Sequence, residues 1–269
     1  MMDAKYIIAD SGGSSTNWGI VLTNNEVVYV QTASLHPKYV FSEEDLLTEL
    51  QTRFGDLKVP LFFYGAGCSS FEIQEKMRSL LKEIGFSQVE VFPDTLAACR
   101  ALCGSEPGWV GILGTGSILI QYDGTRITKR IGGFGSFIGD EGSGFYFGKL
   151  LVRFLLDVEN WESSWSAIFH SKEAILSKLA SAEAQKWIAS LGGLTAHLDF
   201  EFLHQQNVML FIQNYCNQIS DIPSVSLIGT YGFEQKNVVK NVFEKAGIQV
   251  LKQVASPLED LVNFHIVNN

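Results

Sequence analysis

Two short segments rich in glycine and hydroxyl residues could hold a phosphate group. The first comprises Asp10, Ser11, Gly12, Gly13, Ser14, Ser15 and Thr16, and the second comprises Gly114, Thr115, Gly116 and Ser117. Glycine can adopt positive φ angles that turn successive N–H groups toward one anion, and hydroxyl groups add donors. A carboxylate such as that of Asp10 could hold Mg²⁺ through water. Either segment alone also fits an ordinary hairpin turn, but two matched segments favour a polyphosphate site.

Three further places carry candidate side chains. Asp94 lies between an apolar run and a helical pattern, where it could be a helix N-cap or a general base in phosphoryl transfer. The stretch 132–144 contains six glycines, which predicts close backbone approach to a polar group. Asp140 within it could bind sugar hydroxyls or favour a helix N-terminus. Gly229 and Thr230 form either a nucleotide-binding turn or a routine strand–helix turn.

The elements that would position these residues follow one pattern twice. The first half predicts strands near 6–9, 18–22, 26–30, 59–64 and 89–92, with helices from 42, over 71–84 and from 94 to 102. A strand, a Gly/Ser/Thr turn and a returning strand begin again at Trp109, which indicates a duplicated fold. Later, the pattern predicts a helix after Gly142, a strand at 224–228, a helix at 238–246, a strand at 248–250 and a last helix from Pro257. Residues 163–217 look mostly helical and show no recognisable chemistry.

Composition limits the classes of function. The 269 residues include 20 basic and 29 acidic side chains, a net charge of −9, and 46% are hydrophobic. This balance predicts a globular protein without a nucleic-acid or membrane partner, because phosphate surfaces need clustered Lys and Arg. Charged residues near the N-terminus interrupt any apolar leader, so we expect a cytoplasmic protein. The four cysteines lack zinc-site spacing, and neither GxxxxGK[ST] nor GxGxxG occurs.

In this order the segments resemble the sugar-kinase branch of the actin and hexokinase superfamily of ATPases, and in particular the N-acetylglucosamine kinase and BadF/BadG-type ATPase family. The most specific element is Gly-Asp-Glu-Gly-Ser at 139–143. The resemblance implies an α/β protein of two ribonuclease-H-like domains, 1–107 and 108–256, with a cleft between them. Each domain would have a mixed sheet opened by a hairpin meander and covered by helices, and the helix 257–269 could complete the first.

The resemblance also implies roles for individual residues. Asp94 would be the catalytic base that accepts the proton of a sugar 6-hydroxyl as it attacks the γ-phosphate of ATP. The nucleotide and Mg²⁺ would be bound by Asp10, Gly12, Gly13, Ser14, Ser15, Thr16, Gly114, Thr115, Gly116, Gly229 and Thr230. An amino sugar would be bound by His36, Thr115, Gly133 and Asp140. We expect a homodimer. The chain departs from its relatives at the adenosine turn, where it carries the bulky Tyr231.

Two other functions fit the same pattern. A sugar sensor could keep both domains without efficient ATP chemistry. An ATPase that activates a dehydratase or reductase would need cysteines that share an iron–sulfur cluster between subunits, and no such ligand set is recognisable here.

Overall fold

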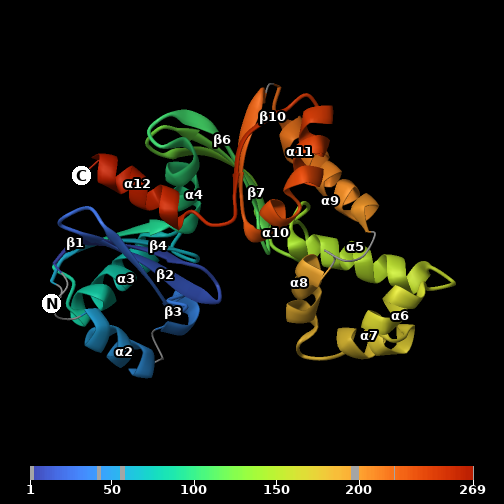
Figure 1. Cartoon of the computed structure of the whole chain (residues 1–269), viewed down its shortest axis with the longest axis horizontal. Helices are drawn as coiled ribbons and strands as arrows, with labels where there is room; N and C mark the ends of the chain where they lie inside the picture. Colours follow the sequence, from blue (N-terminus) through green and yellow to red (C-terminus); the bar gives the residue numbers. More distant parts are fainter. Residues whose placement is uncertain (1–2, 41–43, 55–57, 195–199, 221, 269) are drawn as a thin grey trace. The chain divides into compact units, whose positions relative to one another are not determined.

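The computed structural model describes residues 3–40, 44–54, 58–194, 200–220 and 222–268. The chain forms two compact units (Figure 1): unit 1 consists of Met1–Ser105 with Pro257–Asn269, and unit 2 consists of Glu106–Ser256. Each unit is built around one five-stranded sheet.

The sheet of unit 1 has the order β3-β2-β1-β4-β5. Its strands are β1 (Ala4–Ser11), β2 (Ser15–Leu22), β3 (Val27–Ala33), β4 (Pro60–Gly65) and β5 (Gln88–Pro93). The first three strands form an antiparallel meander, while β1, β4 and β5 run parallel. The carboxyl ends of β1 and β5 therefore point to the same edge of the sheet, which is where Asp10 and Asp94 occur.

Helices cover both faces of this sheet. The helices of unit 1 are α1 (Pro37–Val40), α2 (Glu44–Phe54), α3 (Phe71–Ile84), α4 (Asp94–Cys103) and α12 (Leu258–Asn268). Alternate residues of β1 face opposite sides of the sheet: Ile7 packs in the core with Phe54 of α2 and Leu81 of α3, whereas Ile8 packs with Ala97 of α4 and Leu261 of α12.

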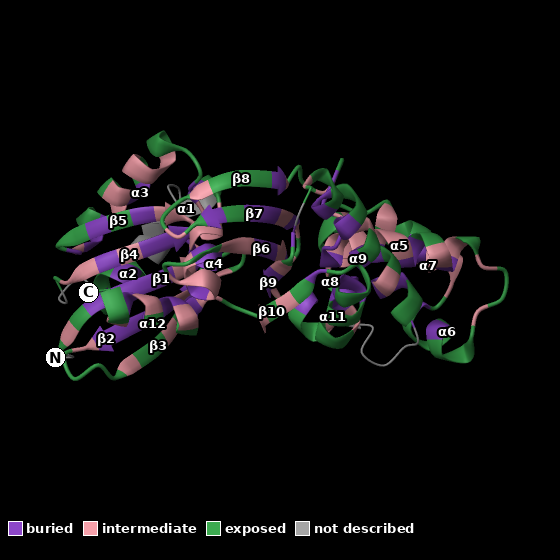
Figure 2. Cartoon of the chain, turned by 90° about the horizontal axis from the view of Figure 1, so that it is seen from above, coloured by how far each residue is buried: buried purple, intermediate pink, exposed green. Residues whose placement is uncertain are grey.

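The sheet of unit 2 has the order β10-β9-β6-β7-β8. Its strands are β6 (Pro107–Leu113), β7 (Ser117–Asp123), β8 (Ile127–Gly132), β9 (Ser224–Ile228) and β10 (Gln249–Val254). As in unit 1, three strands form an antiparallel meander, and the first of them runs parallel to the two remaining strands. The predicted duplication and fold class are therefore confirmed. The sequence did not predict β8, whose residues are largely exposed (Figure 2).

Most of the helices of unit 2 lie between β8 and β9 in the chain. Those between β8 and β9 are α5 (Gly144–Asp157), α6 (Ser163–Phe169), α7 (Lys172–Leu179), α8 (Ala184–Leu194), α9 (Glu201–Asn214) and the 3₁₀ turn η2 (Cys216–Gln218), whereas α10 (Thr230–Glu234) and α11 (Lys236–Lys245) lie between β9 and β10. The buried stripe of α5, with Phe147, Leu151 and Leu155, joins one core with residues of α9 and α11. Within the described part of the chain, no helix has the length and apolar character needed to cross a membrane.

Candidate functional site

The hairpin between β1 and β2 presents an open backbone. The N–H of Gly12 donates to the carbonyl of Ser15 at 2.9 Å and closes the loop. Gly12, Gly13 and their neighbour Ser14 are exposed, and a Cβ atom on Gly13 would meet no atom within 4 Å. Thr16 differs, because it is fully buried and its hydroxyl donates to Ser11 Oγ at 2.8 Å. The glycine–serine part of this turn is therefore accessible to a ligand, while the threonine holds the turn in place.

The prediction that glycines in both turns adopt positive φ angles is wrong. Gly12, Gly13, Gly114 and Gly116 all lie outside the positive-φ region. Each loop closes by a hydrogen bond across the hairpin, from Gly12 to Ser15 and from Gly114 to Gly116. At Gly116 the missing side chain matters instead, since a Cβ there would lie 3.2 Å from the carboxylate of Asp140.

Asp10 and Asp94 form a pair of carboxylates at one edge of the sheet in unit 1. Burial, and secondly the negative charge of Asp94, raise the pKa of Asp10 to about 7. Burial and the same Asp94 charge raise the pKa of the Cys68 thiol to about 12. Asp94 is not the N-cap of α4, because that position is Pro93. Its Oδ1 instead accepts from the N–H of Thr95 at 2.8 Å.

The structure brings His36 beside the first hairpin. Ser34 Oγ donates to the carbonyl of Gly12 at 2.6 Å and accepts from the N–H of His36 at 3.1 Å. The Nδ1 atom of His36 accepts from the N–H of Lys38 at 3.1 Å. Gly67, with φ of +81°, passes so close that a Cβ there would lie 2.9 Å from His36 Nε2. The predicted sugar-binding histidine thus adjoins the predicted phosphate turn.

In unit 2, Ser117 connects the second hairpin to the glycine-rich stretch. Its N–H donates to Asp140 Oδ1 at 3.2 Å, and its hydroxyl donates to the carbonyl of Glu141 at 2.6 Å. Its carbonyl accepts from the N–H of Gly133 at 3.0 Å. Asp140 is buried and has a φ of +68°. Burial raises the pKa of Asp140, while the hydrogen bond from Ser117 opposes that rise.

The turn at Gly229 lies against the same hairpin. Gly229 has a φ of +124°, and a Cβ there would lie 2.5 Å from the carbonyl oxygen of Leu113. The N–H of Gly144 donates to the carbonyl of Gly114 at 2.8 Å. Unit 2 therefore brings together, at the end of β6, the following predicted residues: Gly114, Thr115, Gly116, Gly133, Asp140, Gly229 and Thr230. Thr115 and Thr230 are exposed.

Two of the six glycines in the stretch 132–144 lie close against aromatic side chains. A Cβ on Gly142 would lie 2.7 Å from Phe211 Cβ, and one on Gly132 would lie 2.6 Å from the ring of Tyr215. Asp140 lies three residues before the N-cap of α5. The N-cap of α5 is Ser143, whose hydroxyl accepts from the N–H of Tyr146.

Sequence reasoning missed the polar residues that hold this stretch, because they come from 163–217. Asn207 of α9 and Tyr215, directly after α9, hydrogen-bond to backbone atoms of 140–143. The same hydroxyl of Tyr215 donates to Glu141 Oε2 at 2.8 Å. A polar asparagine on the apolar side of a helix, between Leu203 and Phe211, was the available signal.

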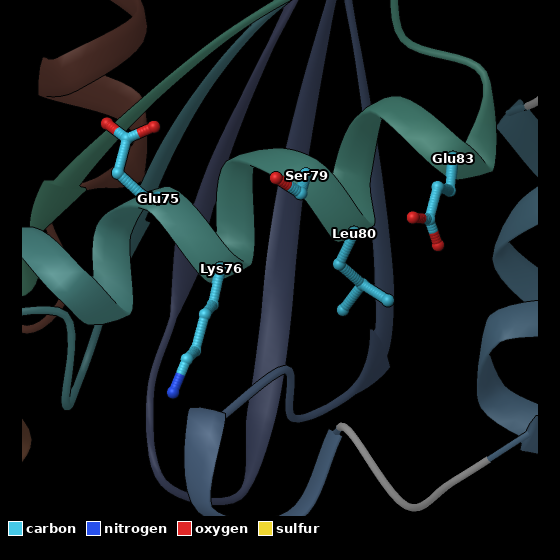
Figure 3. Close-up of a pocket in the computed structure, with 5 residues that line it drawn as sticks. All are labelled: Glu75, Lys76, Ser79, Leu80 and Glu83. Atoms are coloured by element: carbon cyan, nitrogen blue, oxygen red, sulfur yellow. The ribbon is translucent and has the colours of Figure 1, made fainter.

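A surface hollow of about 410 Å³ lies elsewhere in unit 1, along α3. It is lined by Glu75, Lys76, Ser79, Leu80 and Glu83, and Figure 3 shows Lys76 and Leu80 pointing the same way from the helix. Lys76 already pairs with Glu72 at 2.8 Å. None of the predicted site residues lines this hollow. Among the described residues, no three His, Cys, Asp or Glu side chains gather to hold a metal ion.

Comparison with solved structures agrees with this architecture. No protein-family model matches the chain. The proposed N-acetylglucosamine kinase of Porphyromonas gingivalis is 25% identical, with a TM-score of 0.84 over 98% of this chain and 99% of that one. The proposed N-acetylglucosamine kinase of Chromobacterium violaceum is 17% identical, with a TM-score of 0.66 and coverages of 98% and 99%. A ROK-family glucokinase of Streptomyces griseus, solved with glucose and AMPPNP, is 15% identical, with a TM-score of 0.55 and coverages of 97% and 98%.

The chain therefore has the two-domain fold of the actin-like ATPases and sugar kinases. Within that fold it is similar, over nearly its whole length, to proposed N-acetylglucosamine kinases, which confirms the family resemblance expected from the motifs.

Proposed function

We propose that the protein is an ATP-dependent sugar kinase that transfers the γ-phosphate to the 6-hydroxyl of N-acetylglucosamine or a related amino sugar. The observation that carries this proposal is the pair of carboxylates, Asp10 and Asp94, beside an open glycine–serine hairpin in unit 1. A sugar kinase needs one carboxylate to accept a proton and another to hold a cation with the phosphates. The 25% identity to the Porphyromonas protein supports an amino sugar as acceptor.

The donor set fits Mg²⁺. Burial and the charge of Asp94 both disfavour the ionised form of Asp10 and so raise its pKa. A divalent cation bound beside Asp10 would stabilise that ionised form. Mg²⁺ usually binds through one or two protein carboxylates together with water and substrate phosphates. Asp10 would hold the ion through water, and the bound ion would neutralise charge on the phosphate oxygens.

The residues of the chain would then perform the transfer as follows. Asp94 accepts the proton of the sugar hydroxyl while the oxygen forms a bond to the γ-phosphorus and the bond to ADP breaks. Phosphate groups are held by the backbone of 12–15 and by the turn 114–116. The adenosine lies against Gly229 and Thr230. The sugar is bound by His36, Thr115, Gly133 and Asp140.

The test is an ADP-release assay with N-acetylglucosamine, glucosamine, N-acetylmannosamine, muramic-acid derivatives and glucose. We expect turnover with at least one amino sugar in the presence of ATP and Mg²⁺. Asp94→Asn should lower kcat by about a hundredfold or more, because general-base catalysis contributes about 10²–10⁴. The sugar Kd of this variant should stay within about threefold of wild type.

Glu90→Gln is a matched control, because Glu90 is an exposed carboxylate on β5, four residues before Asp94. It should keep wild-type turnover. Undiminished turnover in Asp94→Asn would remove Asp94 from the mechanism. Calorimetry with the sugar and AMPPNP separates the kinase from a sensor, since a sensor would bind sugar but not nucleotide.

A further inference from the structure

Asn207 lies on α9 in the interior of unit 2, with none of its surface exposed. Its Oδ1 accepts from the N–H of Gly142 at 2.7 Å. Its Nδ2 donates to the carbonyl of Ser143 at 2.9 Å and to the hydroxyl of Tyr231 at 3.0 Å. Burying an amide is unfavourable unless its polar atoms are bonded, so these three bonds are what allow Asn207 in this position.

The backbone partners determine the direction of the whole network. The N–H of Gly142 can only donate and the carbonyl of Ser143 can only accept, which orients the amide of Asn207. Asn207 therefore donates to the hydroxyl oxygen of Tyr231. The hydroxyl of Tyr231 can then donate its own hydrogen to His204 Nδ1, 2.9 Å away. Burial lowers the pKa of His204 to about 4, so its ring is neutral at pH 7 and Nδ1 can accept.

Tyr231 belongs to the turn that begins at Gly229. Although it is the bulky departure noted in the sequence, it is only 4% exposed and points into unit 2. Its ring packs on Gly144, where a Cβ would lie 3.5 Å from Tyr231 Cδ2. The hydroxyl of Tyr231 thus connects the turn at 229–230 to Asn207, and Asn207 connects it to the loop that carries Asp140.

Tyr215 holds the same loop through its own hydrogen bonds. Its hydroxyl accepts from the N–H of Asp140 at 3.1 Å and donates to Glu141. The structure therefore offers two tyrosine hydroxyls with different partners. Tyr231 lies on the path between the loop and the turn at 229–230, whereas Tyr215 bonds the loop and interacts with Ser117 of the second hairpin.

We propose that Asn207 is a positioning residue that couples the loop carrying Asp140 to the turn Gly229–Thr230, so that sugar and nucleotide strengthen each other's binding. The inference rests on the proposed function, which assigns the sugar to the loop and adenosine to the turn. A ligand that orders either segment also orders the amide of Asn207, and this lowers the cost of ordering the other segment. The coupling is reciprocal, as linkage requires.

The experiment is calorimetry on the full chain with N-acetylglucosamine and AMPPNP. The measured quantity is the coupling factor, defined as the sugar Kd without AMPPNP divided by the sugar Kd at saturating AMPPNP with Mg²⁺. Tyr231→Phe removes only the hydroxyl and keeps the ring on Gly144. Asn207→Asp keeps an acceptor for Gly142 and loses both donors. Tyr215→Phe is the matched control, since it also removes one buried tyrosine hydroxyl beside the loop.

We expect a wild-type coupling factor of about five or more, which is in the usual range for coupled sites. Tyr231→Phe and Asn207→Asp should bring it close to one, a change comparable to the loss of about one hydrogen bond. Tyr215→Phe should weaken sugar binding but keep the factor. If Asn207→Asp does not fold, Tyr231→Phe decides alone.

A coupling factor in Tyr231→Phe within twofold of wild type would overturn the inference. Independent binding of both ligands to wild type would overturn it too, and would leave the kinase proposal standing. Wild-type protein that binds neither ligand would instead refute the proposed function and this inference with it.

Discussion

At alkaline pH, unit 1 of the variant Asp10→Asn should be more stable than unit 1 of wild type. The carboxyl of Asp10 has an ordinary pKa of 3.8 and is raised to about 7 by burial and by Asp94. A raised pKa means that the folded protein binds the proton more tightly than the unfolded chain. The stability associated with Asp10 is therefore complete below about pH 4 and is lost as the pH rises to about 7.

The size of the effect follows from the shift. The difference between 3.8 and about 7 is about three pKa units, and each unit corresponds to about 1.4 kcal/mol, which sets an upper limit of about 4 kcal/mol. Asp10 keeps some solvent contact, and local relaxation and water lower the figure. We therefore expect wild type to lose about 2 kcal/mol relative to Asp10→Asn between pH 4 and pH 8.

Urea unfolding of both proteins across this pH range measures the loss, in metal-free buffer. The carboxyl carbon of Asp10, identified by its absence in the variant, reports the pKa directly in a ¹³C NMR titration. Asp94→Asn should lower that pKa only in part, because burial is the larger cause. Glu90→Gln should leave it unchanged. An Asp10 carboxyl that titrates below about pH 5 would refute the argument for a buried pair of like charges.

Two other predictions concern the cation and the packing of unit 2. At pH 8, Mg²⁺ at ten times its Kd should raise the free energy of unfolding of wild type by about 1.4 kcal/mol, relative to sodium at equal ionic strength. The variant Asp10→Asn should show no such gain under the same two conditions. Gly148→Ala in α5 would place Cβ 2.1 Å from the backbone oxygen of Ile188 in α8, so urea unfolding should show a loss of about 1–3 kcal/mol. Its control is Gly193→Ala, because a Cβ there would have its nearest neighbour at 3.9 Å. This control should gain up to about 1 kcal/mol from helix propensity. Equal urea midpoints of unfolding in the two variants would contradict the packing argument.

Much of the fold could be predicted because its elements carry local signals. The helix α3 was predicted at its observed bounds, Phe71–Ile84, since its N-cap Ser70 and C-terminal Gly85 mark both ends. The duplicated hairpins were recognisable from two matching glycine turns. The strand β8 was missed because its exposed residues do not alternate with buried ones, and the five-residue α10 is too short to show a helical period.

The candidate site, too, could be predicted only where its residues carry local sequence signals. Residue types and motifs indicated Asp10, Asp94 and Asp140, and the roles assigned to them, like the homodimer, stay predictions. Sequence could not show that Asp140 accepts from the N–H of Ser117, because that contact joins residues 23 positions apart. It depends on the packing of a loop against a hairpin, which no local pattern encodes.

Two glycines of the stretch 132–144 show that a glycine-rich composition can also reflect packing within the protein. Six glycines in 13 residues indicated that something approaches the backbone closely, and this requirement is real, since Gly132 and Gly142 have no room for a Cβ. At Gly132 and Gly142 the approaching groups are aromatic side chains at the end of α9 and directly after it, 69 or more residues later in the chain. A substitution at Gly142 would therefore act first on the packing of Phe211 and on the bond to Asn207, and only through them on Asp140. Loss of activity in such a variant would measure the positioning of the loop rather than a contact with substrate.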